Sequence, residues 1–163
     1  MMIEPMEINV LFDEGMEDSI EADWLERVAG KVLAAQGIES GVEMGLVIVG
    51  QEKIQQLNRD YLEEDEPTDV LSFAMLPEPL AQDVTPFIVP PDGVRHLGEV
   101  IIAYSQAVIQ AEEHRHSVKK EVALLIIHGV LHLLGYDHDE PDSEREMKAR
   151  EAAILDDIEE ELQ

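Results

Sequence analysis

The chain has 163 residues, of which 45% are hydrophobic, so it is large enough to form one domain with a buried core. It contains no cysteine, which excludes disulfide bonds and thiolate metal sites and is typical of an intracellular protein. Its 11 Lys and Arg against 37 Asp and Glu give a formal net charge of −26, which disfavours nucleic-acid binding at long range and is typical of a solubilising surface.

The beginning of the chain does not resemble a targeting segment. Residues Met1 to Glu7 carry acids and lack the basic start and apolar run of a signal peptide. No stretch approaches the length that a membrane-spanning helix needs. We therefore expect a cytoplasmic protein without a membrane partner.

In chain order, strand and helix patterns alternate along the sequence. The expected strands are Glu7 to Phe12, Val42 to Val49, Leu71 to Met75 and Leu97 to Tyr104. The expected helices are Ser19 or Glu21 to Gln36, Gln51 to Tyr61, Ser105 to His114, Ser117 to Leu134, and Asp142 to about Glu160. Gly37 is the expected stop of the first of these helices, and Ser105 and Ser117 are the expected N-caps of theirs. Five of the eight prolines fall between Pro77 and Gly93, which predicts an irregular loop there. Without internal repeats, the order predicts one α+β or α/β layered domain with a sheet of about four strands.

Two helices carry the clearest packing signals. Trp24 lies on the apolar stripe of the first helix, which favours a core anchor over a ligand platform. The helix from Ser117 to Leu134 has apolar residues around much of its circumference, so we expect it to be a buried central helix.

Three of the six histidines fall in the segment HGVLHLLGYDH, at positions 128, 132 and 138. His128 and His132 are four residues apart, so on a helix they share one face. Gly135 is placed to end that helix, and the returning chain can carry His138 toward the pair. Three imidazoles suit zinc and leave a coordination position open, which is typical of a catalytic site. A core histidine with a satisfied hydrogen bond is the usual role of a single His, but chance explains this spacing poorly.

The spacing H-x-x-x-H-x-x-G-x-x-H matches the ligand pattern of metzincin proteases. In those enzymes a Glu after the first His acts as the general base. Here that position is Gly129, which has no side chain to take a proton. The sequence therefore argues against a peptidase.

The same segment resembles the signature of the YbeY family, the zinc-dependent endoribonucleases of ribosomal RNA maturation. Further blocks agree in order and spacing from Val10 onward: Leu57-Asn58 through Tyr61, Pro67 to Phe73, Leu97 to Ile102, and Glu146-Met147 with Glu151, Ile154 and Leu155. The resemblance implies an α+β fold with a mixed four-stranded sheet and about five helices. It also implies a single YbeY-like domain over residues 1–163.

By this resemblance the zinc ligands are His128, His132 and His138. The implied reaction is metal-assisted cleavage of phosphodiester bonds in single-stranded ribosomal RNA, with the small ribosomal subunit as partner and no DNA. Either water or the 2′-hydroxyl of the substrate serves as nucleophile. Asp137 is a candidate to orient a ligand histidine, although a solvated loop aspartate fits equally well.

Several residues match, or depart from, the family's cleft. Thr68, Asp69 and Ser72 match a substrate-binding block, with turn chemistry as the equal alternative for Thr68 and Asp69. The family usually has an Arg after Tyr61, where a guanidinium can grip phosphate, but here that residue is Leu62. Arg59, about one helical turn earlier, is the candidate to bind phosphate in place of that missing Arg. Glu99 replaces the usual Asp of its block.

The negative net charge limits how strongly such a protein can bind RNA. The basic clusters are Arg95-His96, His114-Arg115-His116 and Lys119-Lys120. They are candidates for an RNA funnel, a local positive surface that guides RNA to the site, although such clusters more commonly form a solvated surface. Screening confines repulsion to about 8 Å at physiological ionic strength. We expect weak binding to free RNA that depends on added salt, on Mg²⁺ or on docking to a ribosomal protein. Two other functions stay open: a non-catalytic ribosome-assembly factor, and a zinc hydrolase of another substrate class.

Overall fold

The structure, a computed structural model, describes residues 6–38, 41–63, 68–74, 95–135 and 141–158. Within these ranges the elements are, in order, β1 (Glu7–Phe12), α1 (Ala22–Ala35), β2 (Val42–Val49), α2 (Gln51–Leu62), β3 (Val70–Ala74), β4 (Arg95–Ala103), α3 (Tyr104–Glu113), α4 (Val118–Leu133) and α5 (Pro141–Asp157). The first two strands match the sequence prediction at both ends. No helix in these ranges is both long and apolar enough to cross a membrane.

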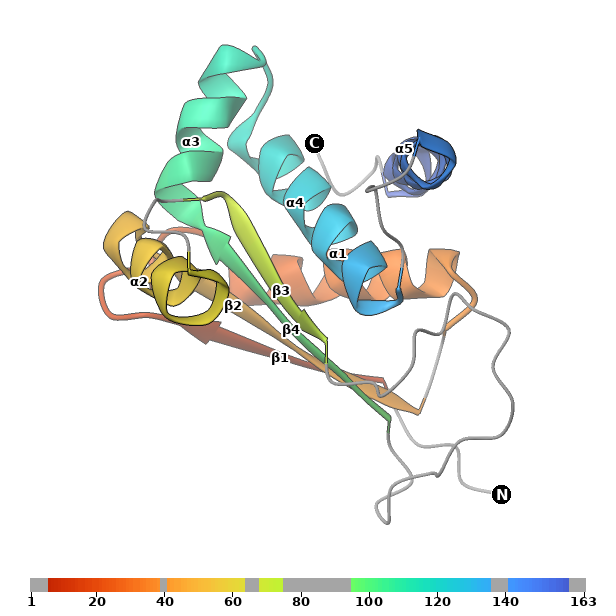
Figure 1. Cartoon of the computed structure of the whole chain (residues 1–163), viewed down its shortest axis with the longest axis horizontal. Coiled ribbons are helices and arrows are strands. Elements are labelled where there is room, and N and C mark those ends of the chain that lie inside the picture. Colours follow the sequence, from red (N-terminus) through yellow and green to blue (C-terminus); the bar gives the residue numbers. More distant parts are fainter. Residues whose placement is uncertain (1–5, 39–40, 64–67, 75–94, 136–140, 159–163) are drawn as a thin grey trace.

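The four described strands form one mixed sheet in the order β1-β2-β4-β3 (Figure 1). β1, β2 and β4 are parallel, whereas β3 pairs with β4 in the antiparallel sense and forms an edge. The two central strands are buried along most of their length, as expected where helices cover both faces. The predicted α+β class with a mixed sheet of four strands and five helices is confirmed for the described residues.

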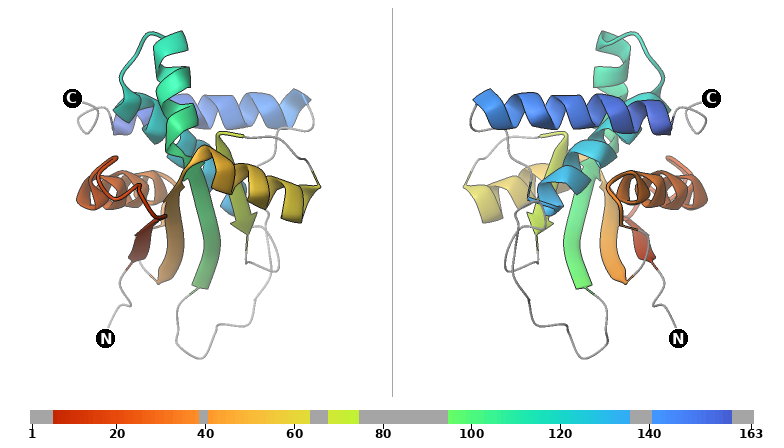
Figure 2. Two further views of the ribbon diagram at one scale, coloured as in Figure 1. Left: turned by 90° about the vertical axis from the view of Figure 1, so that its left-hand side faces the viewer. Right: turned by 90° about the vertical axis from the view of Figure 1, so that its right-hand side faces the viewer.

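Helices cover the two faces of the sheet unequally (Figure 2). α1 and α4 pack on one face, and α5 lies across both of these helices. α2 covers the opposite face. Alternate side chains of β4 serve the two layers, since Val100 and Ile102 join the larger core under α4 while Ile101 and Ala103 join the smaller core under α2.

The central position predicted for α4 is confirmed. Ten of its side chains are buried, and the helix contacts β3, β4, α1, α3 and α5. Trp24 is 2% exposed and belongs to the same core, so its predicted anchoring role is confirmed as well. Burial of large apolar side chains around one helix is what fixes the position of anything that this helix carries.

The helix ends follow local hydrogen bonding. Gly37 and Gly135 have positive φ and donate their N–H groups back to α1 and α4, which confirms both as helix stops. Ser117 caps α4, since its hydroxyl accepts a hydrogen bond from the Lys120 N–H at 3.1 Å. The predicted cap at Ser105 is wrong: α3 begins one residue earlier, and the Ser105 hydroxyl is buried without a hydrogen-bond partner.

Several predicted boundaries moved by one or two residues. β3 begins at Val70 because this residue already pairs with β4, and β4 begins at Arg95 because this residue already pairs with β2. α1 begins at Ala22, so the prediction of Glu21 as its first residue was one position early. The predicted loop from Pro77 to Gly93 and the predicted end of the final helix at Glu160 lie outside the described residues.

Candidate metal centre

Two histidines lie close together near the C-terminal end of α4. The ring centroids of His128 and His132 are 4.6 Å apart, and the ring planes meet at 67°. Both side chains are partly buried, on a helix whose other faces are packed. A buried helix holds the two imidazoles in one arrangement before a ligand arrives, which is the preorganisation that a metal site needs.

A carboxylate from α5 orients the first of these rings. The Nδ1 atom of His128 lies 3.3 Å from the Glu151 Oε1 atom, and both side chains are largely screened from solvent. With the proton on Nδ1, the ring donates to Glu151 and turns its Nε2 atom to the opposite side. Carboxylate–histidine pairs of this kind fix the tautomer and raise the basicity of a ligating imidazole. Sequence reasoning cited Glu151 only as part of a resemblance, because it follows His128 by 23 residues on another helix.

Gly129 allows α4 to approach the sheet closely. A Cβ atom at this position would lie 2.5 Å from Val100 Cγ1 and 2.9 Å from Val100 Cγ2. The Ser72 hydroxyl of β3 donates a hydrogen bond to the Gly129 carbonyl at 3.3 Å. The position where metzincins carry their catalytic Glu is therefore packed against β4, and a side chain there would point into the sheet. Packing gives a structural reason for the missing base.

Residues 136–140 lie outside the described residues. This segment contains His138, the predicted third ligand, and Asp137, the predicted orienting aspartate. Both stay predictions. In the described part of the chain, the orienting carboxylate is Glu151.

The predicted substrate-binding residues lie at the start and middle of β3. Asp69 accepts a hydrogen bond from the Gln110 amide of α3 at 3.2 Å, and its backbone carbonyl accepts from Ala103 N–H at 2.9 Å. The Thr68 hydroxyl donates to the Asp69 carboxylate at 3.4 Å. These contacts join β3 to α3, so Asp69 has a structural role whether or not it meets a substrate. Ser72 lies next to the histidine pair through its bond to Gly129.

Arg59 and Leu62 lie on α2, which covers the face of the sheet opposite α4. The Arg59 guanidinium is half-exposed and pairs with Asp60 at 3.5 Å. Leu62 is 52% exposed, and Tyr61 packs edge-on against Phe73 of β3. Glu99 also belongs to the α2 face, where its Cγ atom would lie 3.1 Å from a Cβ placed at Gly45. A phosphate-gripping role for Arg59 stays a prediction.

The histidines of the basic clusters are paired with acids. His96 Nδ1 lies 2.8 Å from Glu43 Oε1, and His114 and His116 both contact the carboxylate of Glu121. A neutral imidazole carries no charge, and the field of a protonated one is cancelled at longer range by the carboxylate beside it, so these side chains contribute little to an RNA funnel. His114, His116 and Glu121 instead form a group whose ligand atoms could hold a metal ion.

The fold and the site define a class of protein. It is an α+β protein with a carboxylate-oriented histidine pair on a buried helix, an arrangement typical of metal-binding enzymes. The family model of Endoribonuclease YbeY matches residues 12–159, and the chain belongs to that family.

Individual relatives agree with this assignment. Two proteins from Dehalococcoides mccartyi strains, both named Endoribonuclease YbeY, are 48% and 47% identical to the chain over 160 residues, covering 97% of it and 100% and 96% of their own lengths. A Chloroflexus aurantiacus protein of the same name is 42% identical over 149 residues, covering 91% of the chain and 92% of itself. The solution structure of TM1509 from Thermotoga maritima superposes with a TM-score of 0.59 at 25% identity, covering 93% of this chain and 88% of that one.

Proposed function

We propose that this chain is a zinc-dependent endoribonuclease that cleaves single-stranded ribosomal RNA in the cytoplasm, during ribosome maturation or quality control. One YbeY-like domain over residues 1–163 carries the activity. The observation that carries the proposal is the His128–Glu151 contact beside His132, because it presents two imidazoles on a rigid helix in the manner of a metal-binding enzyme. The names of the relatives supply the reaction class.

His128, His132 and His138 are the proposed ligands. The donor set suits the group, since neutral imidazoles are common zinc ligands and three of them leave a position for substrate or water. A zinc ion held there supplies Lewis acidity toward a phosphoryl oxygen and lowers the pKa of a coordinated water. Glu151 keeps the His128 ring in one orientation, and the Ser72–Gly129 bond fixes the edge of the sheet beside the pair.

The substrate side of the site is proposed from β3 and α2. Ser72 bonds to Gly129, which lies between the two histidines, and Thr68 and Asp69 directly precede the same strand, along which an RNA segment in the site would run. Arg59 is the proposed phosphate contact. Its half-exposed guanidinium has access to solvent, and its partner Asp60 is a surface residue whose screened ion pair is weak.

The acidic surface restricts how the substrate arrives. A net charge of −26 repels free RNA but complements the basic surfaces of ribosomal proteins. We propose the small ribosomal subunit as the partner that delivers the RNA strand, with DNA and membranes excluded as partners. Tight binding to free RNA that weakens steeply as salt rises from low values would contradict this proposal.

The test is cleavage of a labelled single-stranded ribosomal RNA fragment by zinc-loaded protein. His132→Ala should abolish cleavage while the far-UV circular dichroism spectrum stays native. His96→Ala is the matched control, since His96 pairs with Glu43 at the opposite end of β4 from α3 and should retain full activity. Cleavage by His132→Ala at the wild-type rate would refute the metal-nuclease mechanism.

A second candidate function is a non-catalytic assembly factor. Exposed apolar side chains favour it, because Tyr61 is 67% exposed and Leu62 occupies the place of a phosphate-binding Arg with 52% of its surface exposed. If zinc-loaded wild-type protein cleaves no RNA but binds small subunits, and Leu62→Glu abolishes that binding, the assembly role replaces the nuclease.

A further inference from the structure

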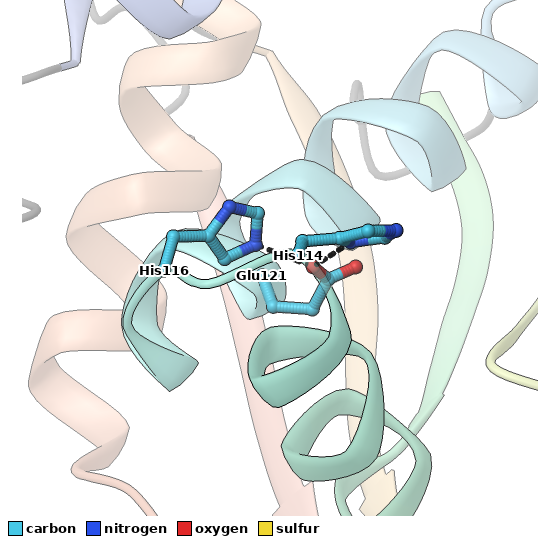
Figure 3. A group of neighbouring side chains, drawn as sticks. All are labelled: His114, His116 and Glu121. Atoms are coloured by element: carbon cyan, nitrogen blue, oxygen red, sulfur yellow. Dashed lines mark hydrogen bonds and ion pairs between the residues drawn. The ribbon is translucent and has the colours of Figure 1, made fainter.

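A tight corner between α3 and α4 brings three ligand-type side chains together (Figure 3). His114 is the C-cap of α3, and Ser117 is the N-cap of α4. Arg115 between them has φ of 57°, and the N–H groups of Arg115 and His116 donate back to the Glu112 and Ala111 carbonyls at 3.2 and 3.0 Å. This is a Schellman ending with Arg where Gly is usual. It turns the side chains of residues 114 and 116 toward the first turn of α4.

Both imidazoles meet one carboxylate oxygen. His114 Nδ1 lies 3.0 Å from Glu121 Oε1, and His116 Nε2 lies 2.6 Å from the same atom. The Glu121 side chain is 5% exposed, that of His116 is 17% exposed, and that of His114 is 57% exposed. A carboxylate this deeply buried is costly unless it is paired, and both of these contacts come from ring nitrogens. The open side of the group is the side of His114.

The donor set is that of a transition-metal site. Two imidazole nitrogens and one carboxylate oxygen, all within 4.8 Å of one another, are present in a single corner. Two His and one Glu occur as the protein ligands of zinc enzymes, and related sets bind iron, nickel and cobalt. Bonds of about 2.0–2.1 Å at tetrahedral angles place ligand atoms about 3.3 Å apart. The observed nitrogen–oxygen separations of 3.0 and 2.6 Å therefore need to open by less than about 1 Å, and the two ring nitrogens, within 4.8 Å of each other, need to settle at a similar spacing.

We propose that His114, His116 and Glu121 form a second binding site for a divalent transition-metal ion. The ion would lie between the two ring nitrogens and Oε1, displacing to solvent any proton held there, and it enters from the exposed side of His114. Bound there, it joins the end of α3 to the start of α4. The sequence interpretation of residues 114–116 as a basic cluster overlooked this group, because the acid that completes it lies five residues further on, within the buried helix.

The second site is separate from the histidine pair. Glu121 and His128 are seven residues apart on α4, so their backbones are about 10 Å apart along the helix axis. Cooperating metal ions in hydrolases lie about 3.5–4 Å apart. An ion at Glu121 therefore takes no part in chemistry at His128. Its consequence is a firmer corner at the N-terminal end of the helix that carries the candidate metal centre.

The experiment is cobalt binding by protein without a histidine tag, followed by visible absorption and by equilibrium dialysis with elemental analysis. The variant His128→Ala/His132→Ala removes the pair on α4, and it should still bind one cobalt ion per chain at micromolar concentration. Adding His114→Ala should remove that ion. His114 is suited to this test because its exposed side chain contributes little packing, so the fold survives its loss.

Controls make each outcome decisive. His96→Ala in the same double variant should leave one ion bound, since His96 and Glu43 offer only two ligands. If the double variant fails to fold, His114→Ala in the otherwise wild-type chain should bind one cobalt ion fewer than wild type. The double variant should also gain thermal stability with cobalt, and the gain should vanish with His114→Ala. A folded double variant that binds no cobalt, or that binds it equally well without His114, overturns the proposal.

Discussion

Replacing Gly129 with Ala tests the close approach of α4 to the sheet. The added Cβ atom would lie 2.5 and 2.9 Å from the two methyl groups of Val100, whose side chain is fully buried. Either α4 must move away from β4 or Val100 must leave its rotamer. Overpacking of this kind costs about 1–3 kcal/mol, and this overlap belongs at the upper end. Alanine recovers about 1 kcal/mol of helix propensity, so we expect a net loss of about 1–2 kcal/mol.

Gly30 provides the matched control in another buried helix. A Cβ atom there would lie 3.7 Å from both Ile8 Cδ1 and Met6 Sδ, which is ordinary contact. Gly30→Ala therefore keeps the propensity gain without a clash and should stabilise the fold by about 0.5–1 kcal/mol. The effects of the two glycine substitutions on stability should have opposite signs and be separated by about 1.5–3 kcal/mol.

Urea unfolding followed by circular dichroism, with a chelator present so that metal binding does not contribute, measures both substitutions. A third variant identifies the clashing partner. Val100→Ala alone should cost about 2 kcal/mol, but combined with Gly129→Ala the loss should fall about 1 kcal/mol short of the sum, because the new methyl group fills the vacated space. If Gly129→Ala stabilises the protein as much as Gly30→Ala does, the close-packing argument is wrong.

Substitutions at three further positions follow from the described geometry. Gly98 has φ of +129°, and a Cβ there would overlap the Phe73 carbonyl of β3, so Gly98→Ala should cost about 3 kcal/mol or more and lower the urea midpoint accordingly. Arg115→Gly should stabilise the fold by up to about 1 kcal/mol in thermal unfolding because Gly adopts the left-handed corner without strain, whereas Arg115→Ala should change it by less than about 0.5 kcal/mol. Glu151→Gln should weaken zinc binding at the proposed histidine site about tenfold, as measured by competition titration against a chromophoric chelator. The free energy of unfolding should not change. A zinc affinity equal to that of the wild type would remove Glu151 from the site.

The fold was predictable where one side chain pattern decided the structure. The alternation of β1 and the apolar run of β2 gave both strands their observed ends, and Gly37 and Gly135 marked their helix stops. The prediction that Ser105 caps α3 was wrong because α3 follows β4 directly, with no loop residue between them to act as the cap. A capping pattern is local, but the place where a strand stops depends on its neighbour in the sheet.

The residues of the candidate site were likewise predictable only where local sequence spacing brings them together. His128 and His132 were recognised because helical spacing alone brings them together. Glu151 was not assigned to the site, because its contact with His128 depends on how α5 crosses α4. The His114–Glu121 group was missed although its members are close in sequence, because it needs the left-handed turn at Arg115.

The contact between His128 and Glu151 has a consequence for biosynthesis. α5 follows α4 along the chain, so the ribosome makes His128 before it makes the Glu151 carboxylate that contacts the His128 ring. The sheet and α1 are already available for α4 to pack against at that stage, because domains fold from the N-terminal side as they emerge. The imidazole of a nascent chain is therefore unoriented until α5 docks. On the function proposed above, the metal site is therefore completed only after nearly the whole chain has been made.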